Sequence, residues 1–260
     1  MLVYPQLATG ALTQFPAQKL RRERTVVNEL PDGSTVKLAD PAGEVTEWRL
    51  PYAGLSDEEM SALQQFFEAA EGSLQEFTFL DPLGNLFSRS DELGNTAWSK
   101  GPFLSITGGA PDPWGGTSAW LVQNSGAAGQ RLTQTLAAPG GYLYCLSAYV
   151  QAAVETPVTL LRGTDRAERM AKTVWVRIID AGRGDSNAES IEFGIEIPAG
   201  SAITLCGLQV EPQGGASVYQ PGTTGGVYAH TCFRDDSLSW IATDVQHHSV
   251  TVNLIHGNRL

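Results

Sequence analysis

Residues 55–82 have the sequence LSDEEMSALQQFFEAAEGSLQEFTFLDP. Ser56 and Glu59 have the spacing of a capping box, in which the hydroxyl accepts a hydrogen bond from the third helical N–H and the carboxylate bonds back to the cap. Gly72 stands where a left-handed residue commonly ends a helix. This spacing predicts a helix over residues 56–71. Its apolar side chains recur at intervals of three and four, which predicts a face packed on the protein's own sheet: Met60, Leu63, Phe66 or Phe67, and Ala70.

Strand patterns lie on both sides of this helix. Before it, Thr25-Val26-Val27 and residues 35–38 flank Pro31-Asp32-Gly33, and an Asp-Gly pair between β-branched residues is a strong hairpin signal. Residues 48–52 predict a further strand with its proline at an end or edge. After the helix, residues 77–80 predict a short strand that ends in a turn. These patterns predict a small N-terminal sheet with one helix.

The C-terminal residues also predict a hairpin. Residues 237–243 and 249–256 flank a five-residue turn at 244–248, and residues 249–254 alternate between polar and apolar side chains. Two strands of this kind are not stable alone in water. We therefore expect them to complete the N-terminal sheet.

Residues 86–226 have a different character, with most of the glycines and a series of short alternating segments. Turn signals such as Pro139-Gly140-Gly141 and Pro198-Ala199-Gly200 separate these segments. Period-two alternation between turns predicts a β-sandwich. The predicted strands are residues 130–136, 143–150, 173–179, 190–197 and 202–210.

Composition narrows the function classes. The 260 residues carry a formal net charge of -11, which argues against nucleic acid as a partner because phosphate binding needs a basic surface. The three cysteines are widely spaced without a CxxC pair, which predicts reduced thiols packed as small apolar groups. There is no signal-peptide pattern and no apolar stretch long enough for a membrane span, so we expect synthesis and folding in the cytoplasm.

The sequence contains no GxSxG, HExxH or Walker-type motif, which favours a protein that is not an enzyme and has no cofactor or metal. His247-His248 is a candidate metal pair but is better explained as turn residues. Asp235-Asp236 with Asp244 is a candidate calcium site but is better explained as a solvated pair beside a hairpin. The candidate glycosidase residues, Glu189, Glu192 and Glu196, are better explained as the solvent-exposed face of a strand.

Three tryptophans in the middle of the chain are candidates for carbohydrate contact. Trp114 lies between Asp112-Pro113 and Gly115-Gly116, a turn that would expose the ring to a sugar. Trp98 is a second, weaker candidate, and packing inward is its alternative. Trp120 alternates within a predicted strand, which favours a core position.

One short segment, KLRRER at residues 19–24, concentrates the positive charge of this acidic chain. Lys19, Arg21, Arg22 and Arg24 are therefore candidates for a subunit interface, because the two different surfaces that meet in a ring can carry opposite charges. A solvated strand is the alternative.

The order of these elements resembles a known family. Residues 55–82 are similar to the capped helix, glycine and aromatic FxFxDP strand of bacteriophage minor tail proteins of the distal-tail type, and residues 232–253 are similar to the closing part of those proteins. In that family, a small split β-barrel with one helix is closed by C-terminal strands. The barrels form a ring, usually a hexamer, that joins the tail tube to the tip.

A second resemblance covers the middle of the chain. Residues 95–100, 146–151, 207–211 and 214–221 resemble the NxAWxK, SxYVKA, LQLExG and YxPT segments of jelly-roll modules in phage tail and fibre proteins, which are often described as carbohydrate-binding modules. Two features depart from the pattern. Gln151 replaces the usual lysine, and a polar loop from Arg162 to Arg169 replaces a turn.

Together the resemblances imply a mainly β protein: a split β-barrel with one α-helix (residues 1–85 and 227–260), interrupted by a β-sandwich or jelly roll (residues 86–226). They imply a structural virion protein at the distal end of the tail, with itself, the tail tube protein and the tip or hub proteins as partners. The insert would face outward toward a host-surface glycan. The alternative is a receptor-binding tail protein whose main task is host adsorption.

Overall fold

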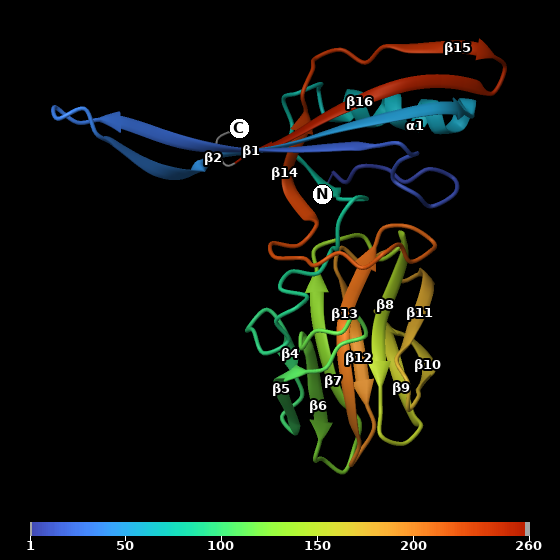
Figure 1. The fold of residues 1–260 in the computed structure, drawn as a ribbon. Helices are drawn as coiled ribbons and strands as arrows, with labels where there is room; N and C mark the ends of the chain where they lie inside the picture. Colours follow the sequence, from blue (N-terminus) through green and yellow to red (C-terminus); the bar gives the residue numbers. More distant parts are fainter. Residues whose placement is uncertain (1, 258–260) are drawn as a thin grey trace. The chain divides into compact units, whose positions relative to one another are not determined.

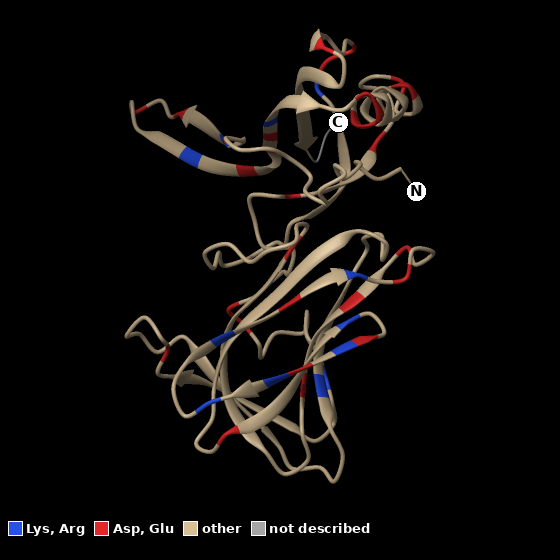
Figure 2. Ribbon diagram, turned by 90° about the vertical axis from the view of Figure 1, so that its right-hand side faces the viewer, with Lys and Arg blue, Asp and Glu red and all other residues tan. Residues whose placement is uncertain are grey.

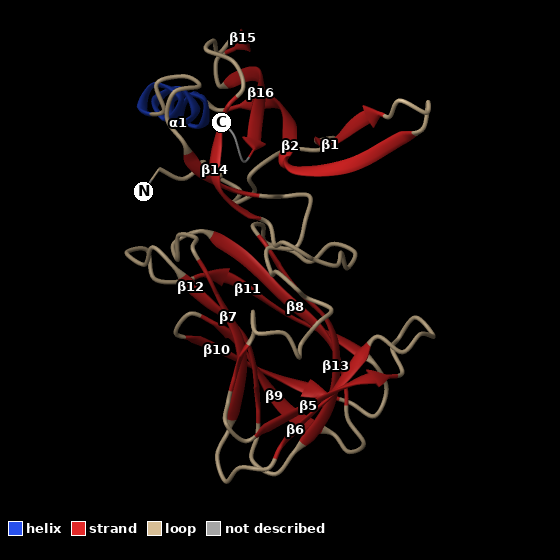
Figure 3. Ribbon diagram, turned by 90° about the vertical axis from the view of Figure 1, so that its left-hand side faces the viewer, coloured by secondary structure: helices blue, strands red, loops and turns tan. Residues whose placement is uncertain are grey.

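The computed structural model describes residues 2–257, and the chain divides into two compact units (Figure 1). One unit, here called the sheet–helix unit, consists of Met1–Ala8, Thr13–Phe79 and Tyr228–Leu260. The other, the sandwich unit, consists of Thr9–Leu12 and Leu80–Val227. Strands dominate both units, and the one helix of the described residues belongs to the first (Figure 3). The prediction of a mainly β fold with a single helix is confirmed.

The sheet–helix unit is built on one six-stranded sheet with the order β1-β2-β16-β14-β3, in which β15 also pairs with β16. Its elements are β1 (Gln18–Glu29), β2 (Thr35–Leu55), α1 (Asp57–Ala69), β3 (Phe77–Leu80), β14 (Val227–Phe233), β15 (Trp240–Asp244) and β16 (His247–Gly257). The expectation of a barrel is wrong, because over the described residues this sheet is open, with β1 at one edge and β3 at the other. β1 pairs only with β2, so it does not close the sheet onto β3.

Helix α1 begins as the sequence predicts. The Ser56 hydroxyl accepts a hydrogen bond from the Glu59 N–H, and the Glu59 side chain accepts one from the Ser56 N–H, which completes the capping box. Met60 and Leu63 are buried, and the Phe66 ring meets Phe77 edge to face at 4.9 Å. The apolar face of the helix therefore covers the protein's own aromatic core, as expected.

The C-terminal strands complete the N-terminal sheet, which confirms that prediction. β16 pairs antiparallel with β2, from His248 opposite Leu55 to Gly257 opposite Val45. The hairpin turn is shorter than predicted, because Asp244 pairs directly with His247. The two histidines accordingly lie in β16, where the His248 ring contacts the Asp57 carboxylate at 2.6 Å.

β1 and the first part of β2 form a long hairpin arm, which Figure 1 shows extending from the rest of the sheet. Gly33 has a φ of 82° in the tight turn at its tip, as the Asp-Gly signal predicts. β2 is longer than expected and includes Pro51. β1 begins opposite Arg49, so Pro51 lies beyond the end of that neighbour and its missing N–H costs no hydrogen bond there.

The sandwich unit consists of two five-stranded sheets, with the orders β10-β9-β12-β7-β4 and β11-β8-β13-β6-β5. Their strands are β4 (Ser99–Lys100), β5 (Leu104–Ala110), β6 (Ala119–Asn124), β7 (Gln130–Leu136), β8 (Leu143–Gln151), β9 (Thr156–Arg162), β10 (Asp165–Ala171), β11 (Val176–Arg183), β12 (Ile191–Ile197) and β13 (Ala202–Glu211). The predicted β-sandwich is confirmed.

Two details of the sandwich differ from the prediction. The expected polar loop from Arg162 to Arg169 is a hairpin of β9 and β10, because Gly163 adopts a φ of 59° and turns the chain at once. β11 begins at Val176 instead of residue 173. Between the sheets, the Tyr144 ring meets Phe193 at 5.2 Å in the core.

The chain leaves and re-enters the sheet–helix unit at one place. The Gly226 N–H donates to the Leu86 carbonyl, and the Asp81 N–H donates to the Gly226 carbonyl. The expectation that residues near 85 and 227 lie close together is thereby confirmed. The buried Asn85 side chain fixes this crossing, since its amide donates to the Leu208 carbonyl at 2.7 Å.

The distribution of charged residues and the state of the cysteines agree with what the composition predicts. Figure 2 shows Lys and Arg residues interspersed with Asp and Glu residues along the chain. The three cysteines are free and buried, as predicted (Cys145, Cys206, Cys232). No helix within residues 2–257 combines the length and the apolar character that crossing a membrane would require.

We propose that the two units are separate domains with boundaries near residues 85 and 227. Residues 80–227 expressed alone are then expected to fold as a β protein, because both sheets of the sandwich lie within them. A chain that ends at residue 227 is expected to aggregate. It lacks β16, which removes Leu254 and Val252, the cross-strand neighbours of Trp48 and Leu50, at a cost of roughly 2 kcal/mol for each apolar side chain that becomes exposed. Circular dichroism and size-exclusion chromatography measure both. A stable monomeric 1–227 fragment beside an unfolded 80–227 fragment would contradict this division.

Candidate functional site

Three aromatic rings meet on the outer face of the β11-β8-β13-β6-β5 sheet. Trp114 comes from the loop between β5 and β6, Tyr149 from β8 and Tyr219 from the segment after β13. The Trp114 and Tyr219 rings are stacked, with centroids 5.8 Å apart and an interplanar angle of 15°. Trp114 also meets the Tyr149 ring edge to face at 5.2 Å. Trp114 nevertheless remains 55% exposed, so much of its ring is open to a ligand.

Strand alternation places Tyr149 on this face. Ala148 and Val150 are completely buried in the sandwich core, so the side chain between them points outward. The register then sets its neighbours, because Tyr149 lies opposite Arg177 of β11 and Cys206 of β13.

The loop that carries Trp114 is held by one carboxylate, Asp112. Asp112 Oδ1 accepts hydrogen bonds from the Trp114 and Gly116 N–H groups, both at 2.9 Å. Its Oδ2 accepts from the N–H of Ser118 at 3.0 Å and from the hydroxyl of Ser118 at 2.8 Å. The Ser118 bonds lead the causes that lower the pKa of the Asp112 carboxyl to about 2, so it is ionised at neutral pH. The indole is therefore held in place before any ligand arrives.

A glycine forms the floor beneath the three rings. Gly207 has a φ of 60° and lies at a bulge, where the register of β13 against β8 shifts between Cys206 and Gln209. A Cβ at this position would lie 3.0 Å from the Tyr149 ring and 3.3 Å from the Trp114 ring. Both the backbone conformation and the close approach of the rings thus require glycine.

The segment that carries Tyr219 is tied to the sheet by buried polar groups. The Glu211 carboxylate accepts from the Ser217 N–H, and the Gln209 side-chain oxygen accepts from the Gln220 N–H at 2.7 Å. The Arg177 guanidinium donates to the Ser217 carbonyl and lies 5.3 Å from the centre of the Tyr149 ring. These bonds fix the backbone on both sides of Tyr219.

An open cleft of about 340 Å³ lies against the rings. Its lining is mainly apolar and aromatic with two polar residues: Asp91, Trp114, Ser118, Tyr149, Val218, Tyr219 and Pro221. We call this the aromatic cleft. The Tyr219 hydroxyl donates to the Asp91 carboxylate and lies 2.9 Å from the Ser90 hydroxyl. Burial, followed by the bond to Asp91, raises the pKa of Tyr219 well above its usual value, so the phenol stays protonated.

The sequence candidates have different outcomes. Trp114 lies in the cleft as an exposed turn residue. The structure contradicts Trp98 as a candidate for carbohydrate contact. Its side chain is 2% exposed and its ring packs on Phe87, with the ring centroids 4.9 Å apart, so it cannot reach a ligand on the surface. Trp120 is only partly buried, although its indole N–H is satisfied by the Asp91 carbonyl.

Sequence reasoning did not identify the partners of Trp114. Tyr149 and Tyr219 appear in the sequence only as parts of strand and family patterns, and Asp91 belongs to no motif. One available signal was Gly207, because a glycine inside a strand pattern often marks a bulge or a close approach. A second was Asp112, which precedes the indole by two residues as in an Asx turn.

The carboxylates of β12 face the solvent side of the other sheet. Glu196 bonds to Arg131 at 3.2 Å and also to Arg166, while Glu192 lies 3.7 Å from Arg131. This ion-paired arrangement agrees with the interpretation as a solvent-exposed strand face. Among residues 2–257, no group of three His, Cys, Asp or Glu side chains is placed to hold a metal ion.

The four basic candidates of the arm have partners within the chain. Arg21 pairs with Glu44 at 2.7 Å, Arg22 with Glu47 at 3.1 Å and Arg24 with Asp40 at 3.4 Å, and Lys19 donates to the Tyr228 hydroxyl at 3.2 Å. The segment is consequently a mixed-charge strand pair and not an open basic patch. Its role at a subunit interface stays a prediction.

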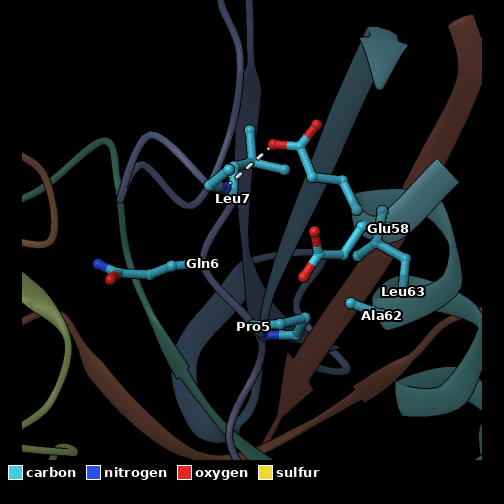
Figure 4. A pocket seen from close by; sticks show the side chains of 8 residues that line it. Pro5, Gln6, Leu7, Glu58, Ala62 and Leu63 are labelled. Atoms are coloured by element: carbon cyan, nitrogen blue, oxygen red, sulfur yellow. Dashed lines mark hydrogen bonds between the residues drawn. The ribbon is translucent and has the colours of Figure 1, made fainter. Parts of the chain in front are cut away.

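A second, smaller pocket belongs to the sheet–helix unit (Figure 4). It lies between the N-terminal segment at residues 5–8 and the first turns of α1. Glu59 closes one side through a hydrogen bond from the Ala8 N–H at 3.0 Å. Since Glu59 also serves the capping box, this pocket is explained by helix capping and packing.

No protein family model and no curated protein sequence matches this chain. Solved structures do resemble it. The CBM22-1 xylan-binding domain of Paenibacillus barcinonensis Xyn10C has 16% identity and a TM-score of 0.42, covering 51% of this chain and 96% of that chain. The C-terminal family 22 carbohydrate-binding module of Clostridium thermocellum Xyn10B has 16% identity and a TM-score of 0.42, covering 54% and 99%. The enzymatically active domain of tailspike protein 4 of bacteriophage CBA120 has 14% identity and a TM-score of 0.40, covering 51% and 22%.

The pKa of Asp112 predicts how the Trp114 loop responds to acid. A carboxyl whose pKa is lower in the folded than in the unfolded chain stabilises the fold above its unfolded pKa of roughly 3.9. That contribution is lost as the pH falls through about 2, the pKa in the folded protein. We expect the Trp114 indole resonance to keep its position until the pH approaches 2, and Asp112→Asn to displace it at neutral pH. Asp185→Asn, in another loop of the same unit, is the control. An unchanged resonance in Asp112→Asn would show that the carboxylate does not hold the loop.

Proposed function

We propose that the sandwich unit binds carbohydrate in the aromatic cleft. The observation that carries this proposal is the open face of Trp114, which is fixed in position beside Tyr149 and Tyr219 and next to the Asp91 carboxylate. A pyranose ring has an apolar C–H face and polar hydroxyl edges. An aromatic surface bordered by a few polar groups complements both parts of such a ligand.

The cleft is organised before binding, which supports the same proposal. Asp112 fixes the loop of Trp114, and the Glu211 and Gln209 bonds fix the segment of Tyr219. A ligand therefore does not have to order either segment, which would otherwise reduce its affinity. We propose a binding role without catalysis, since the best glycosidase candidates, Glu192 and Glu196, are ion-paired on the other sheet.

Removal of the indole tests the proposal. Trp114→Ala should weaken the affinity for a bound polysaccharide by ~2 kcal/mol, or about thirtyfold, because it deletes the open ring of the cleft. Phe103→Ala is a matched control, since Phe103 is equally exposed at 55% and lies at the opposite end of β5. Affinity electrophoresis against neutral polysaccharides measures the change. Equal loss in both variants, or none in Trp114→Ala, would remove the cleft as the binding site.

A second proposal concerns the whole chain, which we place at the distal end of a phage tail as a ring-forming structural component. Its contacts there would be with other copies, the tail tube and the tip or hub proteins. The resemblance of residues 55–82 supports it, and so does the hairpin arm. The outer part of the arm pairs only with itself and exposes apolar side chains: Val27, Leu30, Val36 and Leu38. An isolated two-stranded hairpin is marginally stable in water, which favours a partner that covers it.

Replacement of residues 24–43 by Asn-Gly should abolish self-association and leave the sheet–helix unit folded. The shortened hairpin keeps Arg22 opposite Val45, and the buried part of β2 begins only at Thr46. Sedimentation velocity over a concentration series, with negative-stain images of the larger species, measures the effect. If the unchanged protein stays monomeric even with purified tail tube protein, or occurs at one copy per tail in virions, the ring is wrong.

A further inference from the structure

The charges around the aromatic cleft restrict the sugars that it can accept. We infer that the cleft takes uncharged pyranose units and discriminates against glycans that carry a carboxylate or phosphate on the contacted unit. This inference rests on the proposed carbohydrate binding, and it names the ligand class of the same site.

Asp91 supplies the first negative charge and lies in the cleft lining itself. One of its carboxylate oxygens accepts the Tyr219 hydroxyl proton. The other oxygen has no hydrogen-bond donor among the described residues, and the residue is exposed. A carboxylate is an acceptor only, so the group it can recognise on a ligand is a donor such as a sugar hydroxyl. An anionic substituent would meet a like charge here.

Asp112 supplies the second negative charge and is hydrogen-bonded to the lining residue Ser118. The groups that bond to it are three backbone N–H groups and one hydroxyl, all uncharged, so its charge is solvated without being neutralised. The charges of Asp112 and Asp91 both reach the cleft floor. After burial, which is the main cause, they help to raise the pKa of the Cys206 thiol, beside Gly207, to about 12.

Positive charge does not offset these carboxylates in the cleft. None of its seven lining residues is basic. Arg177 is the neighbouring cation, but it is not among the lining residues. It lies against the Tyr149 ring, and two of its five N–H donors are directed to the Ser217 carbonyl and the Ser147 hydroxyl. Its Nε atom is buried and has no partner in the described chain, so a ligand in the cleft cannot reach it. The polar side-chain groups of the lining are thus the Asp91 carboxylate, neutral hydroxyls and the Trp114 indole N–H, and none of them carries a positive charge.

The expected discrimination is on the order of tenfold or more, because like charges in contact at a partly exposed site repel strongly. Salt should reduce it, since the Debye length falls from ~10 Å at ~0.1 M to ~3 Å at ~1 M. A steric cause of discrimination would be insensitive to salt. The salt dependence therefore separates electrostatic exclusion from poor fit.

The test uses the full chain and paired polymers. The neutral probes are soluble β-1,4-galactan, mannan, β-glucan and xylan, examined by affinity electrophoresis and calorimetry. Each hexose polymer that binds is compared with the same polymer after oxidation of its C6 hydroxymethyl groups to carboxylates. Asp91→Asn removes the lining charge while keeping the side-chain shape. Glu168→Gln removes an equal charge from an exposed position on β10 of the other sheet and is the control.

We expect the neutral polymer to bind at least tenfold more tightly than its oxidised form at low salt. The ratio should fall in Asp91→Asn and at high salt, and it should be unchanged in Glu168→Gln. Oxidised polymer that binds equally well or better, in a manner lost in Trp114→Ala, would overturn this inference and leave the proposed carbohydrate binding intact. A ratio that Asp91→Asn does not change would also overturn it. Failure of every neutral polymer to bind would instead overturn the proposed function itself.

Discussion

The pairing of β16 with β2 is the constraint on which the rest of the structure depends. It joins the C-terminal residues to the N-terminal sheet and places Leu254 of β16 beside Trp48, whose ring packs on Phe79 with the ring centroids 5.0 Å apart. The chain can make this pairing only if the inserted residues return to the place where they left. The Gly226 N–H bond to the Leu86 carbonyl holds the two crossing segments together. Gly222 allows a still closer approach, since a Cβ there would lie 2.2 Å from the Phe87 carbonyl oxygen.

The same crossing also supports the candidate site. The Asn85 side-chain amide donates to the Leu208 carbonyl and accepts hydrogen bonds from the N–H groups of Phe87 and Val210, both at 3.1 Å. Leu208 follows the bulge at Gly207, which forms the floor of the aromatic cleft. One buried polar side chain therefore fixes the outgoing chain and the irregular part of β13 together. Its hydrogen bonds satisfy backbone groups that a bulge would otherwise leave unpaired, and this stabilises the irregularity on which the rings rest.

Local patterns predicted most of the fold, because helix caps, Asp-Gly turns and period-two alternation are interactions between near neighbours in sequence. The capping box at Ser56 and the strand from Ile191 to Ile197 illustrate this. The split β-barrel, which the resemblance implied, was wrong for the described residues, because closure depends on how far strands reach, which local patterns do not encode. The turn around Trp114 made it a candidate for carbohydrate contact, whereas no sequence pattern made Tyr149, Tyr219 or Asp91 candidates. Their meeting depends on the register of β8 against β13 and on the return of the segment after β13, which are long-range features.

The geometry of the cleft also connects the two proposed roles. An open site with one exposed indole and a few polar contacts has little surface with which to bury a ligand, which limits a single site to weak affinity, on the order of millimolar. Weak sites become effective when several are held in one assembly, because each further contact occurs at a high effective concentration, and avidity can exceed the single-site affinity by ~100-fold or more. A ring of copies would supply this multiplicity without any change in the cleft. On this argument the sheet–helix unit and its arm would set how many sites act together, and the sandwich unit would set which glycan they bind.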